Sequence, residues 1–106
     1  MEDSCNPNYG RVDELLELLT KSKSLYILLV LDRKNRSLRF SDLKKLVDAS
    51  STTISRRLKE LEAHNLICRM EISGAGNLFE YSLSEDAKSL SPIMQSLYNW
   101  VERTHT

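Results

Sequence analysis

The chain has 106 residues, enough for one domain with one modest hydrophobic core. Its hydrophobic fraction of 41% and charged fraction of 28% are those of an ordinary globular protein and argue against intrinsic disorder. No apolar run is long enough to span a membrane, no secretion signal is visible at the start, and two cysteines cannot form a disulfide scaffold, so we expect a cytoplasmic protein.

A net charge of zero hides a strong polarity along the chain. Residues 33–59 contain nine Lys or Arg and two Asp, a net charge of +7, whereas residues 1–32 carry −3 and residues 60–106 carry −4. A surface of this kind suits a polyanion such as DNA. The alternative is a solvated helix face on which Arg57 and Lys59 pair with nearby Glu residues.

The first predicted elements are helical. Residues 1–9 are expected to form a flexible arm, followed by a single domain over residues 10–106. Ser24 is expected to cap an apolar helix that ends near Asp32, and residues 37–40 should be short and extended. Between the arm and Ser24 we expect an amphipathic helix, whose apolar residues are Val12, Leu15, Leu16, Leu18 and Leu19.

The centre of the chain is predicted to form a helix-turn-helix over residues 41–64. Ser41 should cap its first helix, residues 48–50 should form the turn, and Ser50 or Ser51 should cap the second helix. The second helix, residues 51–64, should bury Ile54, Leu58 and Leu61.

The hydrophobic period changes after Asn65, a residue that often ends helices. Residues 67–83 alternate on both sides of a glycine-containing turn, which predicts a β-hairpin. We expect Cys68 to be a small buried residue in its first strand. Gly74 and Gly76 also fit a phosphate-binding loop, but no helix start follows them, so a hairpin turn is favoured. The tip has no basic residue and should contact DNA weakly.

The last predicted element is a C-terminal helix over residues 85–103, kinked or divided at Pro92. Its apolar stripe either completes the core of the monomer or meets a second copy of the chain, and we favour the second copy. The predicted dimer interface, which includes the N-terminal helix, consists of Leu15, Leu19, Ile93, Leu97, Tyr98, Trp100 and Val101.

These elements predict a mainly α (α+β) fold, a winged helix-turn-helix with a three-helix core, a β-hairpin wing and extra N- and C-terminal dimerisation helices. In such a fold the second helix of the motif enters the major groove of double-stranded DNA. The residues expected to read bases are Ser51, Thr52, Thr53, Ser55 and Arg56. The residues expected to contact phosphates are Arg36, Arg39, Ser41, Lys44, Lys45, Arg57, Lys59 and Arg69.

Several segments resemble the HxlR-type winged-helix regulators, relatives of the MarR family. They are FSDLK at 40–44 with RLKELE at 57–62, EYSLS at 80–84, and LSPIM at 90–94 with Trp100. The resemblance covers about residues 24–103. It implies cytoplasmic, dimeric and mostly prokaryotic transcriptional regulators, in which the outer helices build the dimer and two recognition helices enter successive major grooves.

The resemblance also makes Cys5 a candidate redox sensor, because an N-terminal cysteine senses oxidants in some relatives. The alternative is an incidental thiol. The charged neighbours of Cys5 are Glu2 and Asp3 rather than basic residues, which disfavours a reactive thiolate.

We therefore predict a sequence-specific DNA-binding transcriptional regulator that acts as a homodimer. The alternative is a winged-helix module for protein–protein interaction without specific DNA binding. His64 and His105 are the only histidines, and no metal-ligand spacing or nucleophile motif is present, so we predict no enzyme, no metal and no cofactor. The sequence does not identify an operator or a small-molecule effector.

Overall fold

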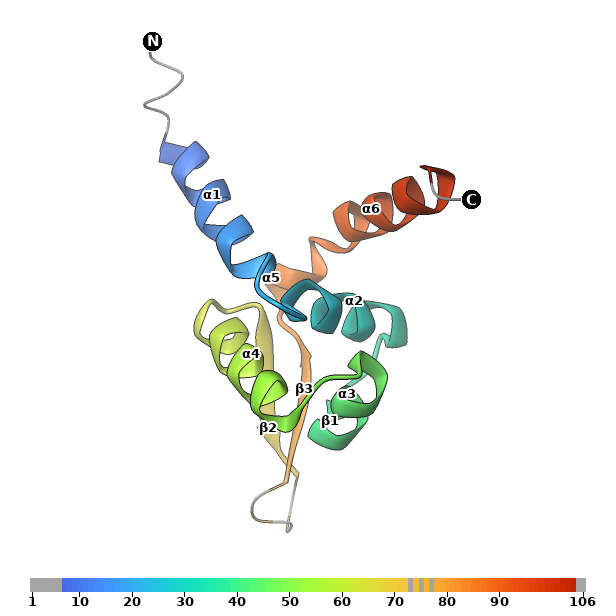
Figure 1. Cartoon of the computed structure of the whole chain (residues 1–106). Coiled ribbons are helices and arrows are strands. Elements are labelled where there is room, and N and C mark those ends of the chain that lie inside the picture. The colour runs from blue at the N-terminus through green and yellow to red at the C-terminus, as the bar shows by residue number, and fades with distance from the viewer. Residues whose placement is uncertain (1–6, 73, 75, 77, 105–106) are drawn as a thin grey trace.

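Three helices pack around one another and against a small sheet, and two further helices leave this body as arms (Figure 1). The computed structural model describes residues 7–72, 74, 76 and 78–104. The helices are α1 (Pro7–Leu19), α2 (Ser24–Lys34), α3 (Phe40–Val47), α4 (Ser51–Ala63), α5 (Glu85–Lys88) and α6 (Ser91–Thr104). The strands are β1 (Leu38–Arg39), β2 (Ile67–Glu71) and β3 (Phe79–Leu83).

The sheet is antiparallel, with strand order β1-β3-β2. Leu38 of β1 pairs with Tyr81 of β3, and Ile67 of β2 pairs with Leu83 of β3. The predicted hairpin over residues 67–83 and the short extended segment before the helix-turn-helix are therefore both confirmed. Together with α2, α3 and α4 they make the predicted winged helix-turn-helix fold.

The core lies where α2, α3 and α4 meet the buried side of the sheet. Leu28 of α2, Leu43 of α3 and Ile54 of α4 are completely buried, which is the arrangement expected when amphipathic helices share one apolar centre. The predicted buried face of α4 is confirmed, because Leu58 and Leu61 are also buried. This packing fixes which side of α4 faces solvent.

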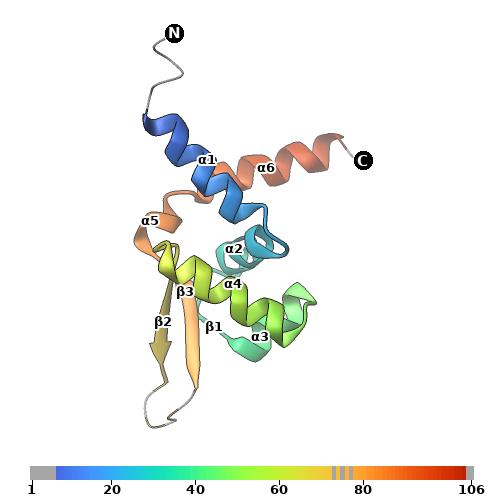
Figure 2. The same cartoon turned by 60° about the vertical axis from the view of Figure 1, so that its left-hand side comes forward.

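Helices α1 and α6 lie at the end of the molecule opposite the wing and point away from each other (Figures 1 and 2). The radius of gyration is 15.3 Å, compared with about 13 Å for a compact domain of this length. The arms account for this excess, since the remainder of the chain forms one packed body. Each arm consequently leaves much of its surface uncovered.

The ends of the chain differ in detail from the prediction. Residues 7–9, predicted as part of a flexible arm, belong to α1, which begins at Pro7. Cys5 lies outside the described residues, so its role as a redox sensor stays a prediction. The predicted C-terminal helix is divided into α5 and α6, and Pro92 occupies the first turn of α6, where a missing backbone N–H costs no hydrogen bond.

Two predicted helix caps are wrong. Ser24 is the first residue of α2, completely buried, and its Oγ has no hydrogen-bond partner; the capping position belongs to Lys23, which has φ 70°. Ser41 lies inside α3, whose capping residue is Arg39. There the backbone N–H of Arg39 donates to Asp42 Oδ2 at 3.2 Å. Ser41 is exposed, so its hydroxyl is available to a ligand.

The prediction that Cys68 is buried is also wrong. Its thiol is free and exposed, because β2 is an edge strand and only its first residue, Ile67, reaches the core. The strand then extends beyond the helices toward the wing tip (Figure 1). In the part of the chain that the structure describes, no helix is both long enough and apolar enough to cross a lipid bilayer.

Candidate nucleic-acid interface

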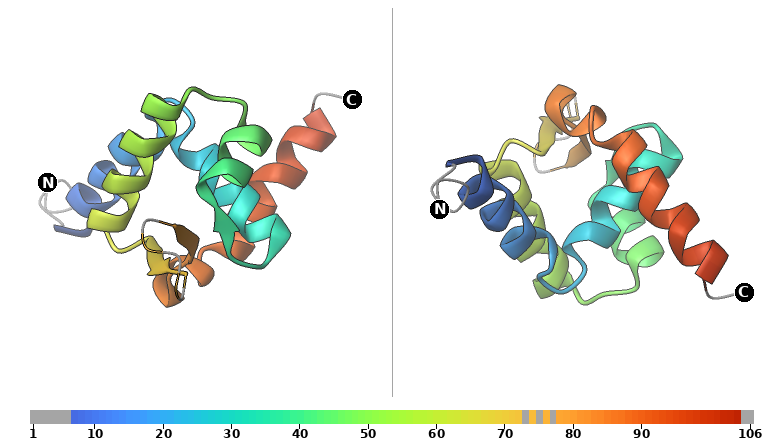
Figure 3. Two further views of the ribbon diagram at one scale, coloured as in Figure 1. Left: turned by 90° about the horizontal axis from the view of Figure 1, so that it is seen from below. Right: turned by 90° about the horizontal axis from the view of Figure 1, so that it is seen from above.

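The N-terminal end of α4 is exposed because the chain turns sharply just before it. Asp48 ends α3 in the left-handed conformation, with φ 58°, and its N–H donates to the carbonyl of Lys44. Ser50 then caps α4 by accepting a hydrogen bond from the N–H of Thr53 at 3.2 Å. The first turn of α4 therefore faces solvent at the end of the helix where the loop from α3 arrives (Figure 3, left).

An open surface groove of about 550 Å³ runs along the exposed side of α4. Its polar wall is one flank of the helix, since residues at spacings of three and four share a face. Phe40, the first residue of α3, is half-buried and supplies an aromatic side. The α4 residues that line the groove are Ser51, Thr52, Ser55, Arg56 and Lys59. Four of the five predicted base-reading residues thus gather on one surface.

Thr53, the fifth predicted base-reading residue, does not line this groove. It is half-buried, and its Oγ1 lies 3.1 Å from the hydroxyl of Ser50, to which its backbone N–H is also bonded. Thr53 therefore belongs to the cap of α4, and we remove it from the base-reading set.

Arg57 is turned away from the groove and paired within the protein. Its side chain is only 12% exposed, and its Nε lies 3.3 Å from Oε1 of Glu60. The second carboxylate oxygen of Glu60 lies 3.4 Å from Nζ of Lys21, in the turn between α1 and α2. The ion-paired alternative thus holds for Arg57, and we remove it from the proposed phosphate contacts.

Arg56 and Lys59 differ from Arg57 in this respect. Both are exposed, and neither takes part in an ion pair with any residue that the structure describes. Their charges are therefore uncompensated at the surface of the groove. An anion that enters the groove meets two cations that need not break an existing pair to bind it.

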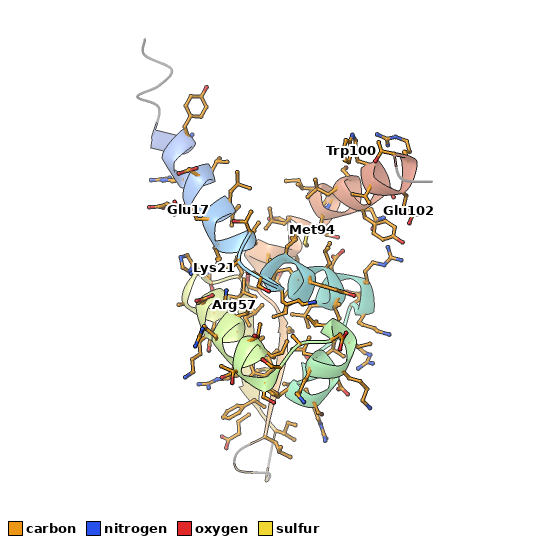
Figure 4. All side chains as sticks on the ribbon, in the orientation of Figure 1. Glu17, Lys21, Arg57, Met94, Trp100 and Glu102 are labelled. Atoms are coloured by element: carbon orange, nitrogen blue, oxygen red, sulfur yellow. The ribbon has the colours of Figure 1, made fainter. Side chains whose placement is uncertain are left out.

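Most of the other predicted phosphate contacts are exposed, although Arg36 lies by a separate hollow that Lys88 and Ser91 also line. Side chains that end in nitrogen point outward from α3 and α4 (Figure 4). The exposed residues in this set are Arg36, Arg39, Ser41, Lys44, Lys45 and Arg69.

Arg69 is the most constrained of them. Its Nε lies 3.7 Å from Glu62 Oε2, and its guanidinium carbon lies 4.6 Å from the centre of the Phe79 ring. Arg69 also lowers the pKa of buried Tyr81, but desolvation by burial outweighs it and raises that pKa overall, with Glu62 adding to the rise. Arg69 is thus held at the base of the wing rather than free at its tip.

The residues predicted for the dimer interface are exposed on α6, whereas on α1 the exposed apolar residues are not the predicted ones. Ile93 and Trp100 are 59% and 53% exposed, and Leu97, Tyr98 and Val101 are exposed as well. On α1, however, Leu15 and Leu19 pack against the core. The exposed apolar residues of that helix are Tyr9, Val12 and Leu16. A helical pattern alone does not show which side of its apolar stripe meets the body.

Two other features of the site were missed. Phe40 was not predicted to belong to the interface. It is an aromatic residue directly before the predicted helix-turn-helix, and that position could have indicated its role. The position of Arg33, part of the basic segment, was not predicted either: it lies over the ring of Tyr98 on α6, 4.5 Å from its centre. Among the described residues, no cluster of three or more His, Cys, Asp or Glu could hold a metal ion.

The sequence model of the HxlR-like helix-turn-helix family matches residues 18–106. The chain belongs to this family. The chain is similar to the helix-turn-helix-type transcriptional regulator YvaP of Bacillus subtilis, 34% identical over 91 residues that cover 85% of this chain and 82% of YvaP. A second regulator of the same organism, YdzF, is 29% identical over 101 residues, 94% of this chain and 92% of YdzF.

Solved structures agree with the HxlR-like fold. The reduced form of the transcriptional regulator YodB from B. subtilis superimposes with a TM-score of 0.75 at 23% identity, over 90% of this chain and 92% of YodB. A MarR-family regulator from Porphyromonas gingivalis superimposes with a TM-score of 0.76 at 21% identity, over 90% and 91% of the two chains. Family membership makes this HxlR-like chain a helix-turn-helix transcriptional regulator and not an enzyme.

Proposed function

We propose that this regulator binds specific sites on double-stranded DNA as a homodimer, with α4 in the major groove. The observation that carries the proposal is the exposed groove on α4, in which Arg56 and Lys59 have no partner within the described protein. The major groove is about 12 Å wide and admits one α-helix, whose N-terminal residues meet the base edges.

The residues in this groove divide into two roles. Arg56 can donate two hydrogen bonds to guanine O6 and N7, and the hydroxyls of Ser51, Thr52 and Ser55 can bond to bases or phosphates. Base reading therefore depends mainly on one guanidinium.

Other basic and hydroxyl side chains would supply the phosphate contacts. Lys59 lines its wall, and Lys44 and Lys45 project from the adjoining helix α3. Arg36, Arg39, Ser41 and Arg69 extend the basic surface on the loop, on β1, at the start of α3 and on the wing. Such contacts position a protein on DNA without reading its sequence.

A homodimer is supported by the uncovered apolar faces of both arms. Exposed Ile93, Leu97 and Trp100 share one side of α6, and exposed Val12 and Leu16 lie on α1. A face of this kind on a small domain needs a partner surface. Two-fold symmetry would present two α4 helices to a pseudo-palindromic site, with half-sites about 34–36 Å apart or a multiple of that spacing.

The test is selection of duplexes from a random library, followed by fluorescence anisotropy of the selected duplex and a scrambled duplex at several salt concentrations. We expect tighter binding to the selected duplex and affinity for both that falls as salt rises. No binding to either duplex at low salt would overturn the proposal. It would favour the alternative, a winged-helix module whose basic face meets an acidic protein.

A further inference from the structure

Phe40 is the one wholly apolar side chain among the described residues that line the groove on α4. The other lining residues carry hydroxyl groups or positive charges: Ser51, Thr52, Ser55, Arg56 and Lys59. A ligand that enters this groove therefore meets an aromatic ring on one side and hydrogen-bonding side chains on the other.

The position of Phe40 is fixed by the elements on both sides of it in the chain. Directly before it, Arg39 of β1 pairs with Glu80 of β3. Phe40 itself begins α3, where the backbone N–H of Arg39 donates to Asp42 Oδ2 at 3.2 Å. Its ring packs partly against the core, on the same helical stripe as buried Leu43 three residues later. The part of the ring that faces the groove is thus held by packing behind it.

The base edges in the major groove differ in the groups that they present. Guanine presents two acceptors, O6 and N7, which suit the unpaired guanidinium of Arg56. Thymine is the base whose edge carries a methyl group, at C5. Phe40 has no hydrogen bond to offer, and burial of an apolar group against its ring is favourable. The pair of Phe40 and Arg56 in one groove therefore matches a thymine close to a guanine.

We propose that Phe40 reads the methyl group of a thymine beside the guanine that Arg56 binds. This inference rests on the proposed insertion of α4 into the major groove, and it adds one base to the recognised half-site. The contact is apolar, so its contribution to affinity is independent of salt, unlike that of the phosphate contacts.

Deoxyuridine tests the contact directly, because it pairs with adenine as thymine does but lacks the methyl group. In the duplex selected with the full chain, each thymine is replaced by deoxyuridine in turn, and affinity is measured by fluorescence anisotropy. We expect one thymine per half-site, next to a guanine, at which the replacement weakens binding about fourfold, as for the loss of one buried methyl group. This factor should be the same at low and high salt.

Variants of Phe40 test the assignment through the ratio of affinities for the thymine and deoxyuridine duplexes. Phe40→Ala should bind the two duplexes equally. Phe40→Leu keeps an apolar side chain against the core, so it remains informative if Phe40→Ala does not fold, and its ratio should fall below that of the wild type. Both duplexes are measured with the same protein, so any loss of folded protein cancels in the ratio.

Two control variants should keep the ratio of the wild type. Phe79→Leu is the matched control, because Phe79 is also half-buried and packs partly against the core, but it lies on β3 in the wing. Thr52→Ser removes the methyl group of a second residue that lines the groove. A ratio that disappears in Thr52→Ser would assign the thymine methyl to Thr52 and overturn the role of Phe40.

Two further results would overturn the inference. One is a selected duplex in which no thymine next to a guanine responds to deoxyuridine. The other is an unchanged ratio in every Phe40 variant that folds, which would mean that the ring only supports the core or the sugar–phosphate backbone. In all three cases the protein still binds its selected duplex, so the proposed function stands. Absence of binding to any duplex would instead refute the proposed function and this inference with it.

Discussion

Lys21 and Glu60 join the base of the α1 arm to α4, the helix that lines the groove of Arg56 and Lys59, with Lys21 Nζ 3.4 Å from Glu60 Oε2. The other oxygen of the same carboxylate is withdrawn from solvent and faces Nε of Arg57 at 3.3 Å. One carboxylate therefore ties α4 to the turn below the arm and neutralises a cation that is nearly buried.

Replacement of Glu60 by Gln should destabilise the protein more than the removal of Lys21. Arg57 is 12% exposed and would lose its counter-charge, so Glu60→Gln should lower the free energy of unfolding by about 1–2 kcal/mol. Lys21 is 47% exposed, and Lys21→Ala should cost at most about 0.5 kcal/mol. Urea unfolding of both variants measures the difference. Equal losses would mean that the pair with Arg57 contributes nothing.

Arg56 and Lys44 should affect DNA binding in different ways. Arg56→Ala should weaken binding to the selected duplex by about 1–3 kcal/mol and affect a scrambled duplex less, because base contacts distinguish sequences. Lys44→Ala should weaken both duplexes alike and reduce the salt slope by about 1. Anisotropy titrations at several salt concentrations give both quantities. Equal losses on the two duplexes for Arg56→Ala would contradict its role in reading bases.

Variants of Arg57 and Lys59, two residues apart on α4, should distinguish a role in stability from a role in DNA contact. Lys59→Ala should reduce the salt slope of DNA binding by about 1 with little change in unfolding, because its charge is exposed and unpaired among the described residues. Arg57→Ala should lower stability and leave the salt slope unchanged, since its side chain is paired with Glu60. A reduced salt slope for Arg57→Ala would show that Arg57 does contact phosphates.

The apolar side of α6 should control the oligomeric state. Leu97→Glu places a charge within the face that we assign to the second copy and should shift the protein to the monomer in sedimentation equilibrium. Glu102→Gln is the matched control, because Glu102 and Trp100 point to different sides of α6 (Figure 4), and it should leave the dimer intact. A wild type that is monomeric at every concentration would end the dimer proposal.

Tyr81 should make the protein less stable in strong alkali. Burial raises the pKa of Tyr81 above its ordinary value of 10.0, with Arg69 opposing the rise and Glu62 adding to it. Its neutral form is therefore favoured in the folded state, so this stability is fully present below pH 10.0 and is lost as pH rises through the folded-state pKa. The Tyr81→Phe variant cannot ionise at this position.

Urea unfolding at about pH 9 and about pH 10.5 measures this effect. The fall in stability between the two should be smaller for Tyr81→Phe than for the wild type. Tyr9→Phe, which changes an exposed tyrosine on α1, should behave like the wild type. An unchanged alkaline loss in Tyr81→Phe would contradict the assignment.

The amino-acid sequence was sufficient for the order and type of the elements and for the family. The apolar spacing of Ile54, Leu58 and Leu61, the stop at Asn65 and the alternation after it are local signals. They depend on helical and strand periods that hold wherever the segment packs. The quoted segments from residue 40 to Trp100 carried the family resemblance, which the match over residues 18–106 confirmed.

The orientation of individual side chains depended on contacts between distant segments. Arg56 and Arg57 are adjacent and chemically identical, yet packing turns the second toward Glu60 and Lys21 and leaves the first in the groove. For the same reason Leu15 and Leu19 face the core instead of a partner, and Cys68 is exposed on an edge strand. A period tells which residues share a face, but the direction of that face is set by what packs against it.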